Sequence, residues 1–338
     1  MVTIDDVAKL AGLSKSTVSR VINHYPHVSP TKKEKVYHAM NTLGYVPNSS
    51  ARSLRNKKTK IIAVIVPRLM NPFFGQLVES IEVEASKQGF QLLICQTMYS
   101  PETEVGHLEL LKTKQVDGII MTSYENEWEI IADYLNYGPL IMCNEFEESA
   151  KIPIIKLDQV YGGYIATSHL INQGHKRIAY CSGGHKSMVA NHRRKGFDQA
   201  LGEHGLPYDE AYSFYNAYSI RDGMDVFNKI RKMDDPPTAV FTGSDEVAAG
   251  IITCAKDHGW KVPQDLAVIG FDNQVISRIM DPKISTVEQP IDQMARQAVK
   301  VMVEKINIRE QPQKERYEFP LKLIVRESTT GKSLSAVE

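Results

Sequence analysis

From residue 61 to about residue 329, short runs rich in β-branched and other apolar residues alternate with longer amphipathic stretches. This alternation is typical of βαβ units, whose parallel strands share a sheet covered by helices. Roughly 270 residues are many for one such sheet, and the runs form two sets that divide near residue 158. We therefore expect two doubly wound α/β lobes, with a ligand site in the cleft between them. The runs that predict strands are 61–66, 92–95, 118–122, 140–143, 177–181, 239–242 and 266–270.

The first 47 residues lack this alternation and predict three short helices. Thr3, Ser14 and Ser29 are suited to begin the three helices, because their hydroxyls can accept backbone N–H bonds at a helix start. Gly12 and Gly44 are suited to end the first and the third. The apolar residues that recur at helical spacing are Ile4, Val7, Ala8, Val18, Val21, Ile22, Val36, Met40 and Leu43.

Charge is distributed unevenly along a chain whose net charge is zero. Residues 1–60 hold 11 Lys and Arg against 3 Asp and Glu, and the remaining 278 residues hold 29 against 37. A basic arm of net +8 on an acidic body of net −8 points to a polyanionic partner such as nucleic acid. Residues 48–59 contain almost nothing that could form a core, so they are expected to be a linker with one or two helical turns at most.

The first two predicted helices have the arrangement of a helix-turn-helix. Ala8 is the small residue where the helices cross, Gly12 lies in the turn, and residues 14–20 give the second helix a polar outer face. That helix would enter the major groove of DNA. Three-helix elements without a DNA function share this pattern, and the local positive charge is what favours DNA here.

The residues that follow Thr3 carry a resemblance to a known family. The run Thr3-Ile-Asp-Asp-Val-Ala-Lys-Leu-Ala-Gly-Leu-Ser-Lys-Ser-Thr-Val-Ser-Arg-Val-Ile-Asn23 closely resembles the headpiece of LacI/GalR transcriptional regulators. The resemblance continues to about Thr329. It includes Gly44-Tyr-Val-Pro-Asn48, Asn71-Pro-Phe-Phe74, Val116-Asp-Gly-Ile-Ile120, Gly174-His-Lys-Arg-Ile178, Lys195-Gly-Phe197, Ser244-Asp-Glu-Val-Ala-Ala-Gly250 and Val268-Ile-Gly-Phe-Asp-Asn273.

The resemblance implies roles in DNA binding for residues of the headpiece and the linker. Lys15, Ser16 and Arg20 would read base edges, since Arg and Lys can donate to guanine O6 and N7. The residues expected to hold phosphates, cap helices or otherwise support the interface are Thr3, Ser14, Thr17, Ser19, Asn23, His27, Ser29, Tyr45 and Asn48. An ordinary solvated helix face remains the alternative for Lys15 and Ser16.

Ala51 and Leu54 lie three residues apart in the linker, on one face of a helix that resembles the family's hinge helix. Leu54 matches the leucine that inserts between base steps in the minor groove, where unstacking bends the duplex. The alternative is that Leu54 packs back on the body, which residue spacing does not exclude.

For the body, the resemblance implies the two-lobed periplasmic-binding-protein fold, used as a sensor. The positions that match the effector cleft of relatives are Phe73, Phe74, Arg193, Tyr218, Asp245, Asp272 and Gln289. Aromatic faces can stack on sugar C–H groups, while carboxylates and a guanidinium can take vicinal hydroxyls, so a sugar or sugar phosphate is expected. A salt bridge between Arg193 and Asp272, and simple core roles for Phe73 and Phe74, are the structural alternatives. Many sugar-responsive relatives carry Asn where this chain has Ser244, which leaves the sugar open.

The partners expected from the resemblance are a double-stranded DNA operator, a small effector and a second copy of the chain. Two headpieces on a two-fold axis would read a pseudo-palindrome. The end of the chain lacks the apolar heptads of lactose-repressor-like tetramers, so a dimer is expected. Repression of carbohydrate catabolism genes is the family expectation. The alternative is a regulator of the catabolite-control type that responds to a phosphorylated carrier protein, although Asp292 and Lys300 replace the aromatic and Arg that grip it.

Other classes of protein are not favoured. Neither a signal peptide nor an apolar run of the ~18 residues that a membrane helix needs is present, so we expect a cytoplasmic protein with no membrane partner. Cys95, Cys143, Cys181 and Cys254 are far apart and predict buried reduced thiols. We find no catalytic constellation, metal-ligand spacing or cofactor motif. The expected domains are a headpiece of 1–47, a hinge of 48–59, a sensor of 60–329 (first lobe 60–158 and 290–318, second lobe 159–287 and 319–329) and a tail of 330–338.

Overall fold

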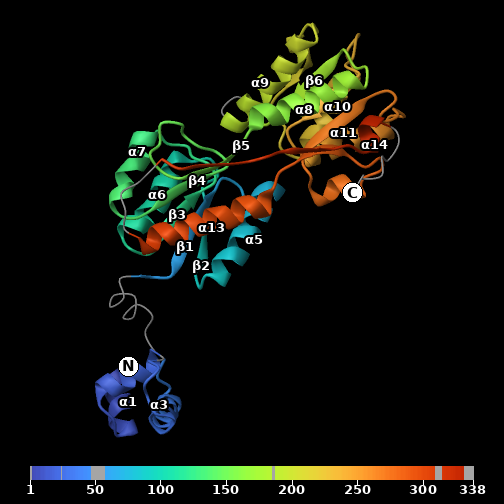
Figure 1. Ribbon diagram of the computed structural model, residues 1–338. Helices are drawn as coiled ribbons and strands as arrows, with labels where there is room; N and C mark the ends of the chain where they lie inside the picture. The colour runs from blue at the N-terminus through green and yellow to red at the C-terminus, as the bar shows by residue number, and fades with distance from the viewer. Residues whose placement is uncertain (1, 24, 47–57, 185–186, 309–313, 331–338) are drawn as a thin grey trace. The chain divides into compact units, whose positions relative to one another are not determined.

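The computed structural model describes residues 2–23, 25–46, 58–184, 187–308 and 314–330 (Figure 1). The chain divides into two compact units: residues 1–59, which hold the headpiece and the predicted hinge, and residues 60–338, which we call the body. Most of the predicted hinge, including Asn48, Ala51 and Leu54, lies outside the described residues. The hinge helix and its leucine wedge therefore stay predictions.

The headpiece consists of three helices, as predicted: α1 (Ile4–Ala11), α2 (Lys15–Ile22) and α3 (Pro30–Leu43). The Thr3 side chain accepts the Asp6 N–H and Asp6 bonds back to the Thr3 backbone, which forms a capping box. Gly12 and Gly44 end α1 and α3 with φ of 64° and 63°, the left-handed region that glycine adopts without strain. Together the three helices bury one small core of Val7, Ala8, Ala11, Val18, Val21, Ile22, Val36 and Ala39.

The first lobe of the body is a six-stranded parallel sheet in the order β11-β5-β4-β3-β1-β2. Its strands are β1 (Ile61–Val66), β2 (Gln91–Gln96), β3 (Gly118–Met121), β4 (Leu140–Cys143), β5 (Ile154–Leu157) and β11 (Arg316–Phe319). Its helices are α5 (Pro72–Lys87), α6 (Pro101–Lys112), α7 (Trp128–Ala132) and α13 (Ile291–Asn307). The central strands β1, β3 and β4 are buried almost throughout, which explains why their sequences are continuous apolar runs.

The second lobe repeats this design with the strand order β12-β10-β9-β8-β6-β7, in which only β12 is antiparallel to its neighbour. Its strands are β6 (Ile178–Cys181), β7 (Ser213–Phe214), β8 (Ala239–Thr242), β9 (Ala267–Asp272), β10 (Ser285–Glu288) and β12 (Lys322–Ile324). Its helices are α8 (Gln159–Asn172), α9 (Met188–Glu203), α10 (Ile220–Ile230), α11 (Asp245–Asp257), α12 (Val275–Ile279) and α14 (Glu327–Thr330). Two doubly wound lobes are thus confirmed.

The chain crosses between the lobes three times, which Figure 1 shows as the passages into α8, into α13 and out of β11. The first crossing joins β5 to α8, the second joins β10 to α13, and the third joins β11 to β12. Since β11 extends to Phe319, the third crossing begins just after the predicted boundary at 318. Among the described residues, none of the helices has the length and apolar character needed to cross a bilayer.

Candidate DNA interface and effector site

Helix α2 presents an exposed polar face on the headpiece. Its apolar residues point into the headpiece core, and Lys15, Ser16 and Arg20 are left exposed to solvent. The Lys15 Nζ forms an ion pair with Asp5 Oδ2 at 2.7 Å. Both side chains are largely exposed, and such pairs contribute little to stability, so Lys15 can exchange Asp5 for another acceptor at small cost.

Some of the other residues predicted to contact DNA cap helices of the headpiece, and others have side chains that make no cap bond. Thr3 and Ser14 cap α1 and α2 through their hydroxyls, and the Asn23 side chain donates to the Ser19 carbonyl at 2.6 Å. Ser29 begins α3 without a side-chain cap bond, so its hydroxyl is not committed to the helix. His27 is exposed, whereas Thr17 and Tyr45 are half-buried, with Tyr45 packed against the headpiece core.

The second lobe holds a buried polar group at the carboxyl ends of its strands, and Arg193 lies at its centre. Arg193 is only 7% exposed. Its Nε donates to Gln159 Oε1 at 2.8 Å, its Nη1 donates to the Gly243 carbonyl at 2.9 Å, and its guanidinium stacks 3.4 Å from the ring centroid of Phe271. Within the described parts of the chain, Nη2 has no protein partner and can take a further acceptor.

Close packing of α8 against α9 brings Arg193 to Gln159. A Cβ on Gly163 would lie 2.0 Å from the Arg193 carbonyl oxygen, and a Cβ on Gly196 would lie 1.9 Å from the Val160 carbonyl oxygen. Only glycine allows the two backbones to approach this closely. The pair of glycines therefore determines where Arg193 lies.

Asp272 is the last residue of β9, and its carboxylate interacts electrostatically with the guanidinium of Arg193. It has a φ of 99°, and Asn273 follows with 53°, so two successive non-glycine residues adopt the left-handed region. Its Oδ2 accepts from Gln274 Nε2 at 3.0 Å, and Oδ1 accepts from Gln289 Nε2. Burial raises the pKa of Asp272, while Arg193 and the two amides act in the opposite direction.

Asp245 lies behind this group. Its side chain is fully buried against Gly270, where a Cβ would lie 2.0 Å from Asp245 Oδ1, and its Oδ2 accepts the Gln274 N–H at 2.7 Å. Burial, and then the nearby Asp272, raise the pKa of Asp245 well above its usual range. The geometry thus gives Asp245 a supporting position beneath the turn that carries Gln274.

The predicted aromatic residues occupy different environments. Phe73 and Phe74, at the start of α5, are buried in an apolar cluster and meet edge to face at 5.2 Å. Tyr218 is 49% exposed, and its ring covers Gly183, where a Cβ would lie 2.4 Å from the ring. Gln289 is therefore bonded directly to Asp272 and reaches Arg193 through Gln159, whereas Phe73 and Phe74 lie in the core.

Residues of the first lobe complete the polar surroundings of this group, and they were not predicted from the sequence. Glu145 follows β4, and its Oε1 accepts from Ser187 Oγ of the second lobe at 3.0 Å. Burial raises the pKa of Glu145 to about 7. Burial likewise raises the pKa of Tyr99 to about 12, with a smaller contribution from Tyr218 of the other lobe. The Glu145–Ser187 hydrogen bond and the electrostatic interaction of Tyr99 with Tyr218 thus connect the two lobes at the carboxyl edges of their sheets.

Three further residues of this group were not predicted from the sequence: Gln159, Gln274 and Phe271. Side chains that follow a parallel strand gather at the sheet's carboxyl edge, and this rule would have found Gln159 if β5 had been predicted as a strand. Ile154–Leu157 is too short and too polar at Lys156 to stand out as a strand. In the described ranges, the acidic, His and Cys side chains form no group of three that could hold a metal ion, and all four cysteines are free and buried.

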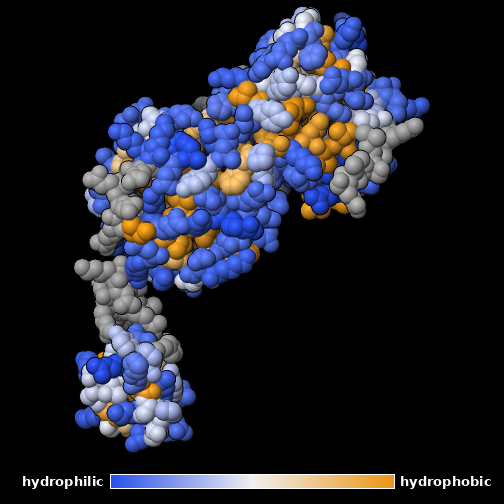
Figure 2. All heavy atoms as spheres, viewed as in Figure 1, coloured by the Kyte–Doolittle hydropathy of each residue, from blue (hydrophilic) through white to orange (hydrophobic). Residues whose placement is uncertain are grey.

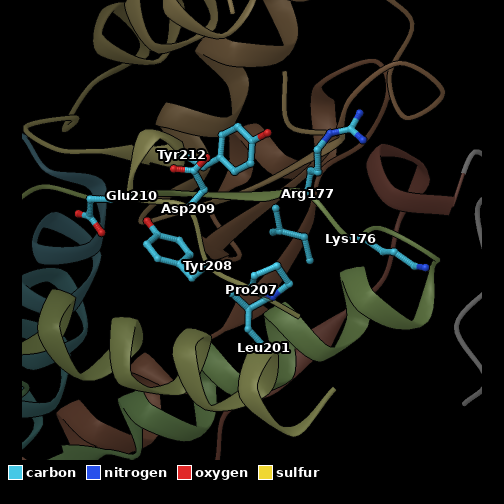
Figure 3. A pocket seen from close by; sticks show the side chains of 9 residues that line it. Lys176, Arg177, Leu201, Pro207, Tyr208, Asp209, Glu210 and Tyr212 are labelled. Atoms are coloured by element: carbon cyan, nitrogen blue, oxygen red, sulfur yellow. The ribbon is translucent and has the colours of Figure 1, made fainter. Parts of the chain in front are cut away.

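A separate hollow lies at the opposite edge of the second lobe. Figure 3 shows Tyr208, Pro207 and Leu201 around it, with Lys176 and Arg177 at the start of β6. This is the amino end of the strands, away from Arg193 and Asp272, which lie beyond the carboxyl ends. Ligands of parallel α/β sheets bind at the carboxyl edge, so this hollow is not our candidate effector site.

A headpiece with a helix-turn-helix and a two-lobed α/β body define a DNA-binding transcriptional regulator with an effector-binding domain. Residues 3–48 match the model of bacterial regulatory proteins of the lacI family, and residues 167–329 match that of the periplasmic binding protein-like domain. The chain belongs to the LacI family, as its sequence predicts.

Relatives match over nearly the whole chain. The NTD biosynthesis operon regulator NtdR of Bacillus subtilis (strain 168) is 44% identical over 329 residues, which are 97% of this chain and all of that protein. Among solved structures, the lac repressor dimer bound to operator and the anti-inducer ONPF is 25% identical with a TM-score of 0.86, covering 97% of this chain and 99% of that one. The complex of the transcriptional regulator CelR with cellobiose is 28% identical with a TM-score of 0.72, covering 97% and 100%.

Proposed function

We propose that this regulator binds a pseudo-palindromic operator as a dimer and represses carbohydrate catabolism genes, under the control of a sugar or sugar phosphate bound between its lobes. The observation that carries the effector part is the buried group of Arg193, Asp272 and Gln289 at the carboxyl edge of the second sheet. Burying a guanidinium and a carboxylate is costly, and a ligand that uses their remaining hydrogen-bonding capacity explains their position.

The chemistry of this group favours a polyhydroxylated ligand. Asp272 has accepted two amide bonds and can accept more, and Arg193 Nη2 is open to an acceptor. Sugar hydroxyls both donate and accept, so one ring can serve the two side chains together. Tyr218 and Tyr99, each about half exposed, provide aromatic faces for the ring's C–H groups. CelR, a similar protein, was solved with cellobiose.

Exposed apolar residues support the dimer. In the second lobe, Val275 and Ile279 of α12 are 73% and 75% exposed. In the first lobe, Leu93 and Ile94 are exposed on β2, an edge strand with one free side. Figure 2 shows that orange apolar areas interrupt the blue polar surface on the face of the body that it presents. A second copy that covers both areas would remove them from water and satisfy the open edge.

In the DNA part of the proposal, each headpiece places α2 in the major groove of one half-site. Lys15, Ser16 and Arg20 would contact base edges, with the caps and open hydroxyls of the headpiece on phosphates. Ala51 and Leu54 would enter the minor groove between the half-sites. The effector acts only through its different affinity for the DNA-binding and non-binding states, so lobe angle and operator affinity are linked.

The test combines operator selection with ligand screening. An operator is selected from random duplexes with the purified full-length protein, and melting temperature is then measured with a panel of neutral sugars, cellobiose among them, and sugar phosphates. A hit should raise the melting temperature and change the operator dissociation constant. A protein that selects an operator but responds to no member of the panel would lack the proposed effector class.

The rival is a regulator that responds to a phosphorylated carrier protein. The start of α13 gives little support to it, because Asp292 accepts a hydrogen bond from Ser80 of α5 at 2.8 Å, and a carboxylate repels a phosphate. In the same operator assay, stimulation by a phosphorylated carrier protein without any sugar response would favour the rival.

A further inference from the structure

A continuous line of buried hydrogen bonds joins Arg193 to Asp272 through two glutamine side chains. Arg193 Nε donates to Gln159 Oε1 at 2.8 Å, and Gln159 Nε2 donates to Gln289 Oε1 at 3.4 Å. Gln289 Nε2 then donates to Asp272 Oδ1. Gln159 and Gln289 are 2% and 5% exposed, so the line is shielded from water along its length.

The chemistry of the two ends gives this line one direction. Arginine can only donate, so Gln159 must turn its oxygen towards Arg193 and its amide nitrogen towards Gln289. An ionised carboxylate can only accept, so Gln289 must turn its nitrogen towards Asp272. Each amide therefore has a single satisfied orientation. Successive bonds of this kind polarise one another between a cation and an anion.

The two glutamines also stand at two of the three lobe crossings. Gln159 is the first residue of α8, directly after the crossing from β5. Gln289 follows the last residue of β10 and precedes α13, which returns to the first lobe. The Gln159–Gln289 bond therefore ties the first crossing to the second, and its outer ends are the two charged groups of the effector site.

We propose that Gln159 and Gln289 are positioning residues that form an amide relay between the crossings and thereby make the angle between the lobes depend on how Arg193 and Asp272 are bound. This inference rests on the proposed function for the identity of the ligand but not for the relay itself. A ligand that pulls Arg193 away from Gln159, or Asp272 away from Gln289, lengthens that end bond of the relay. A ligand that moves either residue closer to its glutamine strengthens the bond. Because the relay is buried, water does not replace a weakened bond, and because each amide has one orientation, a change at one end alters the Gln159–Gln289 bond between the crossings.

The matched comparison lies at the same carboxylate. Gln274 also donates a buried amide bond to Asp272, but it comes from the turn between β9 and α12, and its other hydrogen bonds within the described residues go to Asp245 and Ser277, not to a crossing. Gln274→Leu thus removes a bond to Asp272 and leaves the relay complete. Gln159→Glu does the reverse, because the carboxylate still accepts from Arg193 but has no hydrogen to donate to Gln289. Gln289→Leu interrupts the relay at its other member.

The experiment measures the distance between the lobes in the ligand-free full chain by pulsed electron paramagnetic resonance. Spin labels at Glu129→Cys on α7 and Lys229→Cys on α10 use exposed positions, while the native cysteines are buried. The labelled protein is diluted with an excess of unlabelled protein, so that one labelled subunit is present per dimer. Folding of each variant is checked by its melting curve.

Gln159→Glu and Gln289→Leu should each change the ratio between the lobe angles of the DNA-binding and non-binding states by about fivefold, the effect of one hydrogen bond worth about 1 kcal/mol. Gln274→Leu should leave the distance distribution as in the unsubstituted protein. A folded Gln159→Glu or Gln289→Leu variant with an unchanged distribution would overturn the relay. An equal change in Gln274→Leu would also overturn it, since Asp272 alone would then be responsible. None of these readouts depends on whether a sugar binds, so failure of the proposed function is seen separately.

Discussion

The polar groups of the headpiece and those of the second lobe are arranged in opposite ways. On α2, the predicted DNA-reading side chains are exposed, and the ion pair of Lys15 with Asp5 is held on the surface. At the carboxyl edge of the second sheet, Arg193 and Asp272 are buried and fixed by glutamine side chains, a backbone carbonyl and an aromatic ring.

The difference follows from the partner that each surface is suited to. DNA is a dense polyanion that supplies its own acceptors, so cationic side chains can stay solvated on the surface before DNA binds, at little cost in free energy. A small ligand offers few contacts, and a site must be ordered in advance if those contacts are to give affinity. Substitutions in the buried group should therefore lower the free energy of unfolding, whereas substitutions on α2 should lower the affinity for DNA and leave stability unchanged.

The largest expected effect is on the buried side. Arg193→Met removes the cation that acts electrostatically on Asp272 and the donor to Gln159 and to the Gly243 carbonyl, so the free energy of unfolding should fall by about 3 kcal/mol, as when a buried charge loses its opposite charge. Urea denaturation followed by tryptophan fluorescence measures this. Arg296→Met, at an exposed cation of α13, is the control and should change stability by less than about 0.5 kcal/mol. Equal stabilities of the two variants would contradict the buried network.

The next effect concerns the close approach of α8 and α9. Gly196→Ala places a methyl 1.9 Å from the Val160 carbonyl oxygen, so the helices must separate, at a cost of about 2 kcal/mol. Gly202→Ala, later on the same helix, meets nothing within 4 Å and should stabilise the protein by about 0.5 kcal/mol through its helix propensity. Urea denaturation of both variants measures the two changes in the free energy of unfolding. Destabilisation by both substitutions would show that contact with α8 is not the cause of the loss in Gly196→Ala.

On the exposed side, the effect should appear in DNA binding only. Arg20→Ala and Lys15→Ala should each cost about 1 to 3 kcal/mol of binding free energy at particular base pairs and leave the melting temperature unchanged. Competition with a set of singly substituted operators measures the loss at each position. Uniform weakening on every sequence would assign both residues to phosphates instead.

The smallest effect is a pH dependence at Glu145. Its pKa is raised from 4.5 to about 7, so between these values the folded protein keeps a proton that the unfolded chain has lost. The free energy of unfolding should therefore fall as pH rises through this window. Glu145→Gln cannot ionise, and its stability should be flatter between pH 5 and 7. A slope equal to that of the unsubstituted protein would mean that Glu145 does not titrate there.

The headpiece could be predicted from sequence almost helix by helix, because its caps and its apolar spacing are local. The two lobes followed from strands such as Ile61–Val66, which are buried on both faces and therefore apolar throughout. The short strands β5 and β10 were missed because polar residues interrupt them, and Gln159 was missed together with β5. The supporting position of Asp245 depends on Gly270, 25 residues away, and the sequence around Asp245 does not indicate that contact.

The most direct test of the account follows operator binding by fluorescence anisotropy, with and without a sugar that raises the melting temperature, in the full-length protein and in Arg193→Lys. We predict that the sugar changes the operator dissociation constant of the unsubstituted protein by at least about fivefold, within the usual range of allosteric coupling. Arg193→Lys, which keeps the charge and loses the guanidinium fork, should bind the operator normally and respond weakly. A sugar that binds without changing operator affinity, or a full response in Arg193→Lys, would contradict the account.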